Sequence, residues 1–221
     1  MDPQEKDANR QRYEVRHAEF GYDERTLGWT KGRHKLRYEI LLSSWPEATQ
    51  SVLDVGCGFG DMAAYCHESG RGHWRYTGID IVPALIAEGH AHHPGVDLRL
   101  HDMDDAGLPD GYDVIVASGV FSHRLKDNMA FIERAFERFA EAAGIGFAAN
   151  FMSPAADVRY DNLFYPDPGA IFDIARRYSK RITLRHDYMP FEYTVQVHVD
   201  DAFSSDSVVF EPYEGLIDRA R

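Results

Sequence analysis

The sequence predicts an α/β fold in which a mostly parallel, doubly wound sheet carries helices on both faces. Between residues 51 and 152, five short apolar runs alternate with segments of helical pattern. This order is typical of buried parallel strands joined by right-handed crossovers. Residues 191–199 instead alternate strictly between apolar and polar side chains, which favours antiparallel strands at the end of the sheet.

Composition and charge restrict the class of protein. The chain has 221 residues, of which 44% are hydrophobic and 27% charged, and its net charge is -12. One globular domain is expected, and the negative charge argues against a nucleic-acid partner. No apolar run approaches the roughly 18 residues that span a bilayer, and the first 15 residues lack a secretory apolar segment. We therefore expect a cytoplasmic protein without a membrane partner, either a monomer or a homodimer.

The elements before and after the central repeat complete the predicted architecture. Residues 4–20 and 32–42 have helical patterns and are joined by a glycine-punctuated link, which predicts an N-terminal helical cap or lid over 1–45. Residues 46–200 form the predicted main domain, and 201–221 an acidic tail without an assigned role. The predicted strands are 51–55, 76–82, 96–103, 112–118 and 144–151, followed by two within 181–199. The other predicted helices are 61–70, 82–92, 127–143 and 169–178.

Three alternate glycines follow the first strand and precede a helix. Gly56, Gly58 and Gly60 let the backbone turn tightly and approach a ligand without Cβ obstruction. Cys57 lies within this loop, and we expect it to be a reduced packing residue. A loop between a strand and a helix is the usual position for a nucleotide-type cofactor.

Three aspartates are predicted at the same edge of the sheet. Asp54, Asp80 and Asp102 end the first, second and third strands, and open α/β folds bind ligands at that edge. Aspartates also follow strands as helix N-caps, but three in register with a glycine loop favour a ligand site. Asp80 is placed to accept hydrogen bonds from ribose hydroxyls, and Asp102 to contact an adenine amino group.

The charge of the loop separates two cofactor classes. A dinucleotide loop usually has the pattern G-x-G-x-x-G/A, but here Asp61 stands at the last position. An anion is unfavourable beside a pyrophosphate. S-adenosylmethionine has no phosphate and carries a sulfonium and an α-ammonium group. An acidic site favours that cofactor, whose product is S-adenosylhomocysteine.

The motif set resembles that of the class I S-adenosylmethionine-dependent methyltransferases of the small-molecule type. "LDVGCGFGD" is similar to their motif I, "YTGIDIV" to their second motif and "YDVIVASGVF" to the motif of their fourth strand. The resemblance implies a Rossmann-like, seven-stranded mixed sheet in the order 3-2-1-4-5-7-6 with strand 7 antiparallel. It also implies that Asp80 holds the ribose, His101, Asp102 and Met103 line the adenine pocket, and the loop backbone cradles the methionine part. The predicted cofactor residues are Asp54, Gly56, Cys57, Gly58, Gly60, Asp80, Ile81, His101, Asp102, Met103 and Ser118.

The acceptor side depends on less patterned segments. His123 follows the fourth strand, titrates near neutrality and is the candidate general base, although a structural hydrogen bond explains it equally well. The predicted substrate-binding residues are Tyr22, Trp29, Arg159, Tyr160, Tyr165, His186 and Tyr188. The N-terminal aromatic side chains could equally pin a helix to the sheet, and residues 186–188 could form a simple hairpin turn. The histidines at 90, 92 and 93 lack an acidic ligand at clear spacing, so no metal is expected.

The sequence thus predicts a methyltransferase that acts on a small-molecule acceptor, with O-methylation favoured. The alternatives are an N-methyltransferase of a small molecule or peptide, an NAD-linked oxidoreductase, and a module that binds S-adenosylmethionine without catalysis.

Overall fold

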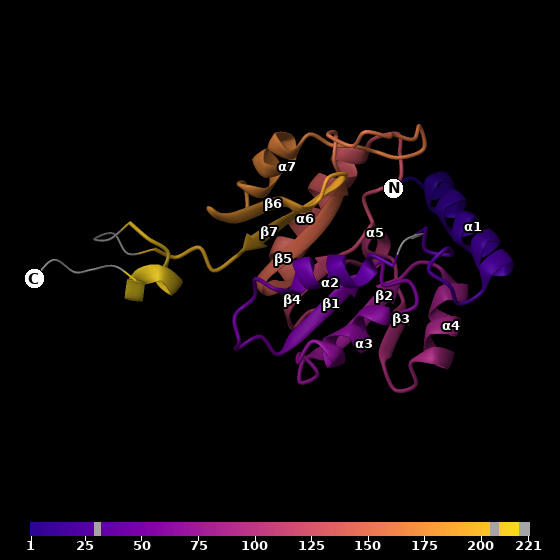
Figure 1. Ribbon diagram of the computed structural model, residues 1–221, viewed down its shortest axis with the longest axis horizontal. Coiled ribbons are helices and arrows are strands. Elements are labelled where there is room, and N and C mark those ends of the chain that lie inside the picture. Colours follow the sequence, from indigo (N-terminus) through magenta and orange to yellow (C-terminus); the bar gives the residue numbers. More distant parts are fainter. Residues whose placement is uncertain (29–31, 204–207, 217–221) are drawn as a thin grey trace, which may run out of the picture.

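The computed structural model describes residues 1–28, 32–203 and 208–216, and it confirms the predicted sheet. Seven strands lie in the order β3-β2-β1-β4-β5-β7-β6 (Figure 1). Strands β1 to β5 pair in parallel, and β7 is antiparallel to both β5 and β6. The strands are β1 (Ser51–Val55), β2 (Arg75–Asp80), β3 (Asp97–Leu100), β4 (Tyr112–Ala117), β5 (Ala143–Met152), β6 (Arg181–Met189) and β7 (Glu192–His198).

The helices begin and end close to their predicted positions. They are α1 (Pro3–Phe20), α2 (His34–Leu42), α3 (Asp61–Glu68), α4 (Pro83–His92), α5 (Met103–Ala106), α6 (Asn128–Ala142) and α7 (Pro168–Ala175), followed by a 3-10 helix, η1 (Glu211–Leu216). The sequence did not predict α5, because four residues are too few to leave an apolar period. Asp102 caps it, accepting a hydrogen bond from the amide of Asp104 at 2.8 Å.

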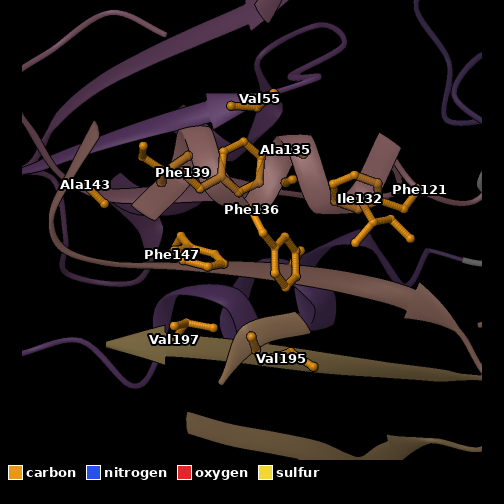
Figure 2. Packing of buried hydrophobic residues seen from close by; sticks show 14 of the residues in the cluster. Val55, Phe121, Ile132, Ala135, Phe136, Phe139, Ala143, Phe147, Val195 and Val197 are labelled. Atoms are coloured by element: carbon orange, nitrogen blue, oxygen red, sulfur yellow. The ribbon is translucent and has the colours of Figure 1, made fainter. Parts of the chain in front are cut away.

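Apolar side chains fill both faces of the sheet. On one face, α6 and α7 cover β1, β4, β5 and β7; on the other, α2 and α3 cover β1, β4 and β5. Figure 2 shows Phe136 and Phe139 of α6 beside Phe147 of β5, and the Phe136 and Phe147 ring centroids are 5.0 Å apart. Such aromatic pairs stabilise a core beyond the area they bury, so the sheet is a rigid base for its carboxyl edge.

Strand β7 is buried on both faces despite its alternating sequence. Its polar side chains find partners inside the protein: Gln196 Nε2 donates to the carbonyl of Ile40 at 2.7 Å, and the Glu192 carboxylate pairs with Arg37 at 2.7 Å. The alternation therefore marks a strand whose second face is covered by α2 rather than by water.

Helix α1 lies against α4 at one end of the molecule, and η1 lies at the opposite end (Figure 1). Asp2 and Glu5 form a capping box at the start of α1, and Gly21, with a φ of 64°, ends the helix. Over the described ranges, no helix is long and apolar enough to cross a membrane. The division into cap, main domain and tail stays a prediction.

Candidate active site

A cavity of about 810 Å³ lies at the carboxyl ends of the parallel strands. Side chains from α1, from the start of α2 and from the β6–β7 turn enclose its other sides. Its volume is within the range of about 300–1,000 Å³ that is usual for small-molecule sites. The predicted site residues that line it are Gly56, Cys57, Gly58, Asp80, Ile81, His101, Asp102, Met103, Ser118, His123 and Tyr160.

The glycine loop needs its glycines for conformation and for space. Gly56 and Gly58 have φ values of 73° and 59°, and a Cβ on Gly56 would lie 2.5 Å from Val120 Cγ2. The amide of Gly56 donates to the carbonyl of Ile79, and that of Gly58 donates to Asp80. Because these two donors are already used, the loop offers fewer free amides for a pyrophosphate.

Asp80 is buried at the end of β2 and faces the cavity. Its Oδ2 accepts from the Gly58 amide and its Oδ1 from the Val82 amide, both at 2.9 Å. Burial raises its pKa to about 6, although the two amides act in the opposite direction. Each carboxylate oxygen can accept a further hydrogen bond, so Asp80 can hold a ligand with neighbouring hydroxyl groups.

Ion pairs attach helix α1 to the segment that follows β3. Lys6 Nζ lies 2.9 Å from Asp102 Oδ2 and 2.6 Å from Asp105 Oδ1, and Arg10 Nε donates to the Ile81 carbonyl at 3.0 Å. Burial acts to raise the pKa of Asp102, but the hydrogen bonds from Lys6 and from the backbone hold it below its ordinary value. These contacts hold α1 over the part of the cavity that is predicted to bind adenosine.

The end of β4 joins a buried polar network. Ser118 Oγ is enclosed and has no hydrogen-bond partner in the described part of the chain. The next amide, of Gly119, donates to Asn150 Oδ1 at 2.7 Å, and Asn150 Nδ2 donates to Glu192 Oε1 at 2.9 Å. Burial raises the pKa of Glu192, opposed by the Arg37 guanidinium. The network fixes this wall of the cavity and leaves the Ser118 hydroxyl without a partner among the described residues.

His123 lies in the cavity wall beside α1. Its Nε2 is 3.4 Å from the Tyr13 hydroxyl oxygen, whereas its Nδ1 is enclosed by protein, so Nε2 is the nitrogen that can meet a ligand. Burial lowers its pKa to about 4, and the charges of Arg12 and Arg16 act in the same direction. The imidazole is therefore neutral at pH 7 and can accept a proton.

Comparisons with known proteins agree with this geometry. The model of a methyltransferase domain family matches residues 52–142. The putative methyltransferase Rv1506c of Mycobacterium tuberculosis is 34% identical over 160 residues, which cover 66% of this chain and 92% of that protein. The chain belongs to the class I S-adenosylmethionine-dependent methyltransferases.

Solved structures share the fold of this methyltransferase at low sequence identity. The N-methyltransferase NodS of Bradyrhizobium japonicum, in complex with S-adenosylhomocysteine, has a TM-score of 0.60 and 16% identity over 85% of this chain and 97% of that chain. The magnesium protoporphyrin IX methyltransferase of Synechocystis, with bound S-adenosylhomocysteine, has a TM-score of 0.59 and 12% identity over 86% and 94%. The cofactor of the methyltransferase is S-adenosylmethionine, and its product is S-adenosylhomocysteine.

The residues at the strand ends fit this cofactor chemically. Asp80 supplies a buried carboxylate for hydroxyl groups, and Ser118 supplies a hydroxyl without a partner among the described residues. The carboxylate of Asp80 in the cavity wall favours a ligand with sulfonium and ammonium groups. No group of three histidine, cysteine or acidic side chains within the described ranges is arranged to hold a metal ion.

Two predicted cofactor residues of the methyltransferase do not line the cavity. Asp54 points to the opposite side of β1, where its Oδ2 accepts a hydrogen bond from the Tyr76 hydroxyl at 2.7 Å and its Oδ1 is enclosed without a partner. Gly60, with a φ of 82°, is the N-cap of α3, and a Cβ there would lie 2.6 Å from Leu98 Cδ2. Both residues support the glycine loop on the side that faces away from the cavity.

The structure places several predicted substrate residues elsewhere. Tyr22 borders a separate cavity of about 340 Å³, where its hydroxyl donates to Asp61 Oδ1 at 2.5 Å and its ring stacks on His92 at 3.7 Å. Tyr188 lies behind the cavity wall, 3.2 Å from Glu192. His186 is exposed on β6. Trp29 lies outside the described residues.

The loop after β5 reaches the cavity through Tyr160 alone among its predicted substrate residues. Arg159 and Tyr165 do not line the cavity; the Arg159 guanidinium lies 5.7 Å from the Tyr165 ring centroid, and the Tyr165 hydroxyl accepts from the Tyr160 amide at 3.0 Å. This arrangement supports the loop and leaves the Tyr160 side chain in the wall.

Sequence reasoning did not select several polar or charged residues of the wall, among them Tyr13, Arg16, Arg33 and Glu192. Tyr13 and Arg16 lie in a helix whose pattern carries no site signal. In the sequence, Glu192 is one of the polar residues that alternate with apolar residues along the predicted strand. A charged residue inside a strand buried on both faces is the only signal that the sequence offered for it.

Proposed function

We propose that the methyltransferase transfers a methyl group to an oxygen atom of a small-molecule acceptor. One observation carries the proposal: a single cavity joins the ends of β1 to β4 with His123 and with side chains from α1, α2 and the β6–β7 turn. The methyl donor and the methyl acceptor then occupy the same cavity, and its volume suits small molecules. The net charge of -12 disfavours a nucleic-acid acceptor.

In this proposal the strand ends hold the cofactor. Asp80 accepts hydrogen bonds from the ribose hydroxyls, and His101, Asp102 and Met103 surround the adenine. The backbone of the glycine loop and the Ser118 hydroxyl hold the methionine part. The positions of these residues in the cavity wall support the assignment.

When bound, S-adenosylmethionine supplies a methyl group on a sulfonium, and its departure needs no acid. The protein contributes orientation and the exclusion of water, which together account for up to roughly 7–11 kcal/mol of barrier lowering. Helix α1, held by Lys6 and Arg10, covers the site, and the Arg37–Glu192 network fixes the opposite wall.

His123 takes the proton of the acceptor hydroxyl in this scheme. A hydroxyl oxygen becomes strongly acidic as it forms its new bond to carbon, so a neutral imidazole with a pKa of about 4 is basic enough to receive the proton at Nε2. The Tyr13 hydroxyl, 3.4 Å from Nε2, orients the ring. Burial, followed by the negative charge of Asp80, raises the pKa of Tyr13 to about 12, so Tyr13 stays neutral.

The test is formation of S-adenosylhomocysteine from S-adenosylmethionine over matched acceptors. Each pair consists of a hydroxyl compound and its amine analogue of the same size. Turnover with hydroxyl compounds and not with the amines supports the proposal. Turnover confined to amines would assign the enzyme to N-methylation and overturn it.

A further inference from the structure

Arginine side chains gather in the wall of the cavity. Arg16 of α1 and Arg33, which immediately precedes α2, line the cavity together with Arg37. Arg37 is paired with Glu192 at 2.7 Å. In the described part of the chain, no carboxylate lies within the ion-pair distance of 4.0 Å from the guanidinium of Arg16 or Arg33. Both side chains are half-buried.

A shortage of acidic residues does not explain this lack of partners. The chain has 36 acidic residues against 24 lysines and arginines, and arginines elsewhere are paired. Arg71 lies 3.0 Å from Glu39, and Arg185 lies 2.9 Å from Asp187. Charged side chains that are withdrawn from water are usually paired, so guanidinium groups in a cavity wall with no carboxylate within ion-pair distance favour an anion from outside the chain.

Electrostatic effects within the cavity agree with the geometry. After burial, the charges of Arg12 and Arg16 are the causes that lower the pKa of His123. A neighbouring carboxylate would offset such charges. Although Asp157 and Glu192 also line the cavity, the arginine charges therefore prevail at His123, in a protein that is strongly negative as a whole.

Arg33 is positioned to bind a planar anion. Its guanidinium carbon lies 5.2 Å from the centroid of the Phe191 ring, and both residues line the cavity with Pro190. Stacking on an aromatic ring holds the guanidinium by its face. Its N–H groups point outward in its own plane, where they can donate two parallel hydrogen bonds to a carboxylate or phosphate.

The position of Phe191 separates this site from the cofactor's own carboxylate. The glycine loop follows β1, whereas Phe191 immediately precedes β7, and β4 and β5 lie between these strands. Three strand spacings amount to about 14 Å. The cofactor residues lie at the ends of β1 to β4, so the space beside Phe191 belongs to the acceptor.

We infer that the acceptor carries an anionic group, a carboxylate or a phosphate, and that Arg33 binds it beside Phe191. The inference rests on the proposed function, because it assigns the acceptor half of the same cavity. It restricts the acceptors to small acids whose apolar part contacts side chains such as Val120, Val158 and Leu163.

Calorimetry on the full chain saturated with S-adenosylhomocysteine tests the inference. The probes are benzoate, phenyl phosphate and benzamide, which share a ring and differ in charge. We expect benzoate or phenyl phosphate to bind about tenfold or more tightly than benzamide, and R33Q to remove that preference while its S-adenosylhomocysteine affinity stays unchanged. The tighter of the two anions identifies the anionic group.

The matched control is R75Q. The Arg75 guanidinium also lies on an aromatic ring, 4.4 Å from the Tyr112 centroid, but at the opposite edge of the sheet. The control must keep the anion preference. Binding of benzamide as tight as that of both anions, no anion binding, or an unchanged preference in folded R33Q would overturn the inference. Weaker S-adenosylhomocysteine binding by R33Q would assign the arginine to the cofactor and overturn it too. Failure of the wild type to bind S-adenosylhomocysteine would instead contradict the proposed function.

Discussion

Asp54 is a buried carboxyl group whose charge destabilises the fold near neutral pH. It is 2% exposed, and burial raises its pKa from the ordinary value of 3.8 to about 7, with the charges of Asp80 and Asp61 adding to the effect and the Tyr76 hydroxyl opposing it. The folded-state pKa is above that of the unfolded chain. Protonation of Asp54 therefore stabilises the protein below about pH 4, and this contribution is lost as the pH rises to about 7.

The substitution Asp54→Asn removes this pH dependence. The loss for the wild type between about pH 4 and pH 8 is about 4 kcal/mol. The asparagine oxygen can still accept from Tyr76. Its amide NH₂ lies where Oδ1 has no partner, as does the O–H of the protonated wild-type carboxyl below about pH 4. The two proteins should therefore be about equally stable near pH 4, and the variant should be more stable than the wild type by about 4 kcal/mol near pH 8.

Urea unfolding at a series of pH values measures this growing difference in stability. The control is Asp110→Asn, which removes the same charge from an exposed position and should shift the stability curve by less than about 0.5 kcal/mol. Parallel stability curves for the wild type and Asp54→Asn between about pH 4 and pH 8 would refute the buried-charge account.

Three further predictions concern the site. Asp80→Ala should weaken S-adenosylhomocysteine binding about tenfold or more because hydrogen bonds to a charged acceptor are lost; unchanged affinity by calorimetry would reject the ribose assignment. His123→Gln should lower turnover by about 10²-fold or more and leave cofactor affinity unchanged, and an equal loss in both would remove His123 as the base. Glu192→Gln should lower the free energy of unfolding in urea by about 2–3 kcal/mol, because the half-buried Arg37 then lacks the Glu192 carboxylate. A variant as stable as the wild type would show that the ion pair contributes nothing to stability.

Local patterns in the sequence were sufficient for the sheet and for the cofactor side of the cavity. The strand ends, the glycine loop and the aspartates at the strand ends lie in short stretches of sequence. Periodicity and the family resemblance were therefore enough to place Asp80 and Asp102 at one edge of the sheet. Asp54 shows the limit of that approach. It lies one residue before the end of β1. Because successive side chains of a strand face opposite sides, its carboxylate points to the face that α2 and α3 cover.

The acceptor side depends on contacts between distant segments. Lys6 meets Asp102 and Arg37 meets Glu192 across 96 and 155 residues of sequence, and no local pattern encodes such distances. The sequence predicts His186 and Tyr188 in a polar-aromatic turn after the sixth strand, but both residues lie within β6 itself. His186 is exposed there, and Tyr188 lies behind the cavity wall. Pro190, Phe191 and Glu192, which follow β6, are the residues that line the cavity.

Calorimetric titration of the purified protein with S-adenosylhomocysteine tests the central claim most directly, with NAD as the control ligand. The account predicts one binding site for S-adenosylhomocysteine, no heat of binding with NAD, and a loss of affinity in Asp80→Ala. Binding of NAD, or S-adenosylhomocysteine binding that is the same in Asp80→Ala and in the wild type, would contradict the assignment of the cavity at the strand ends as the cofactor site.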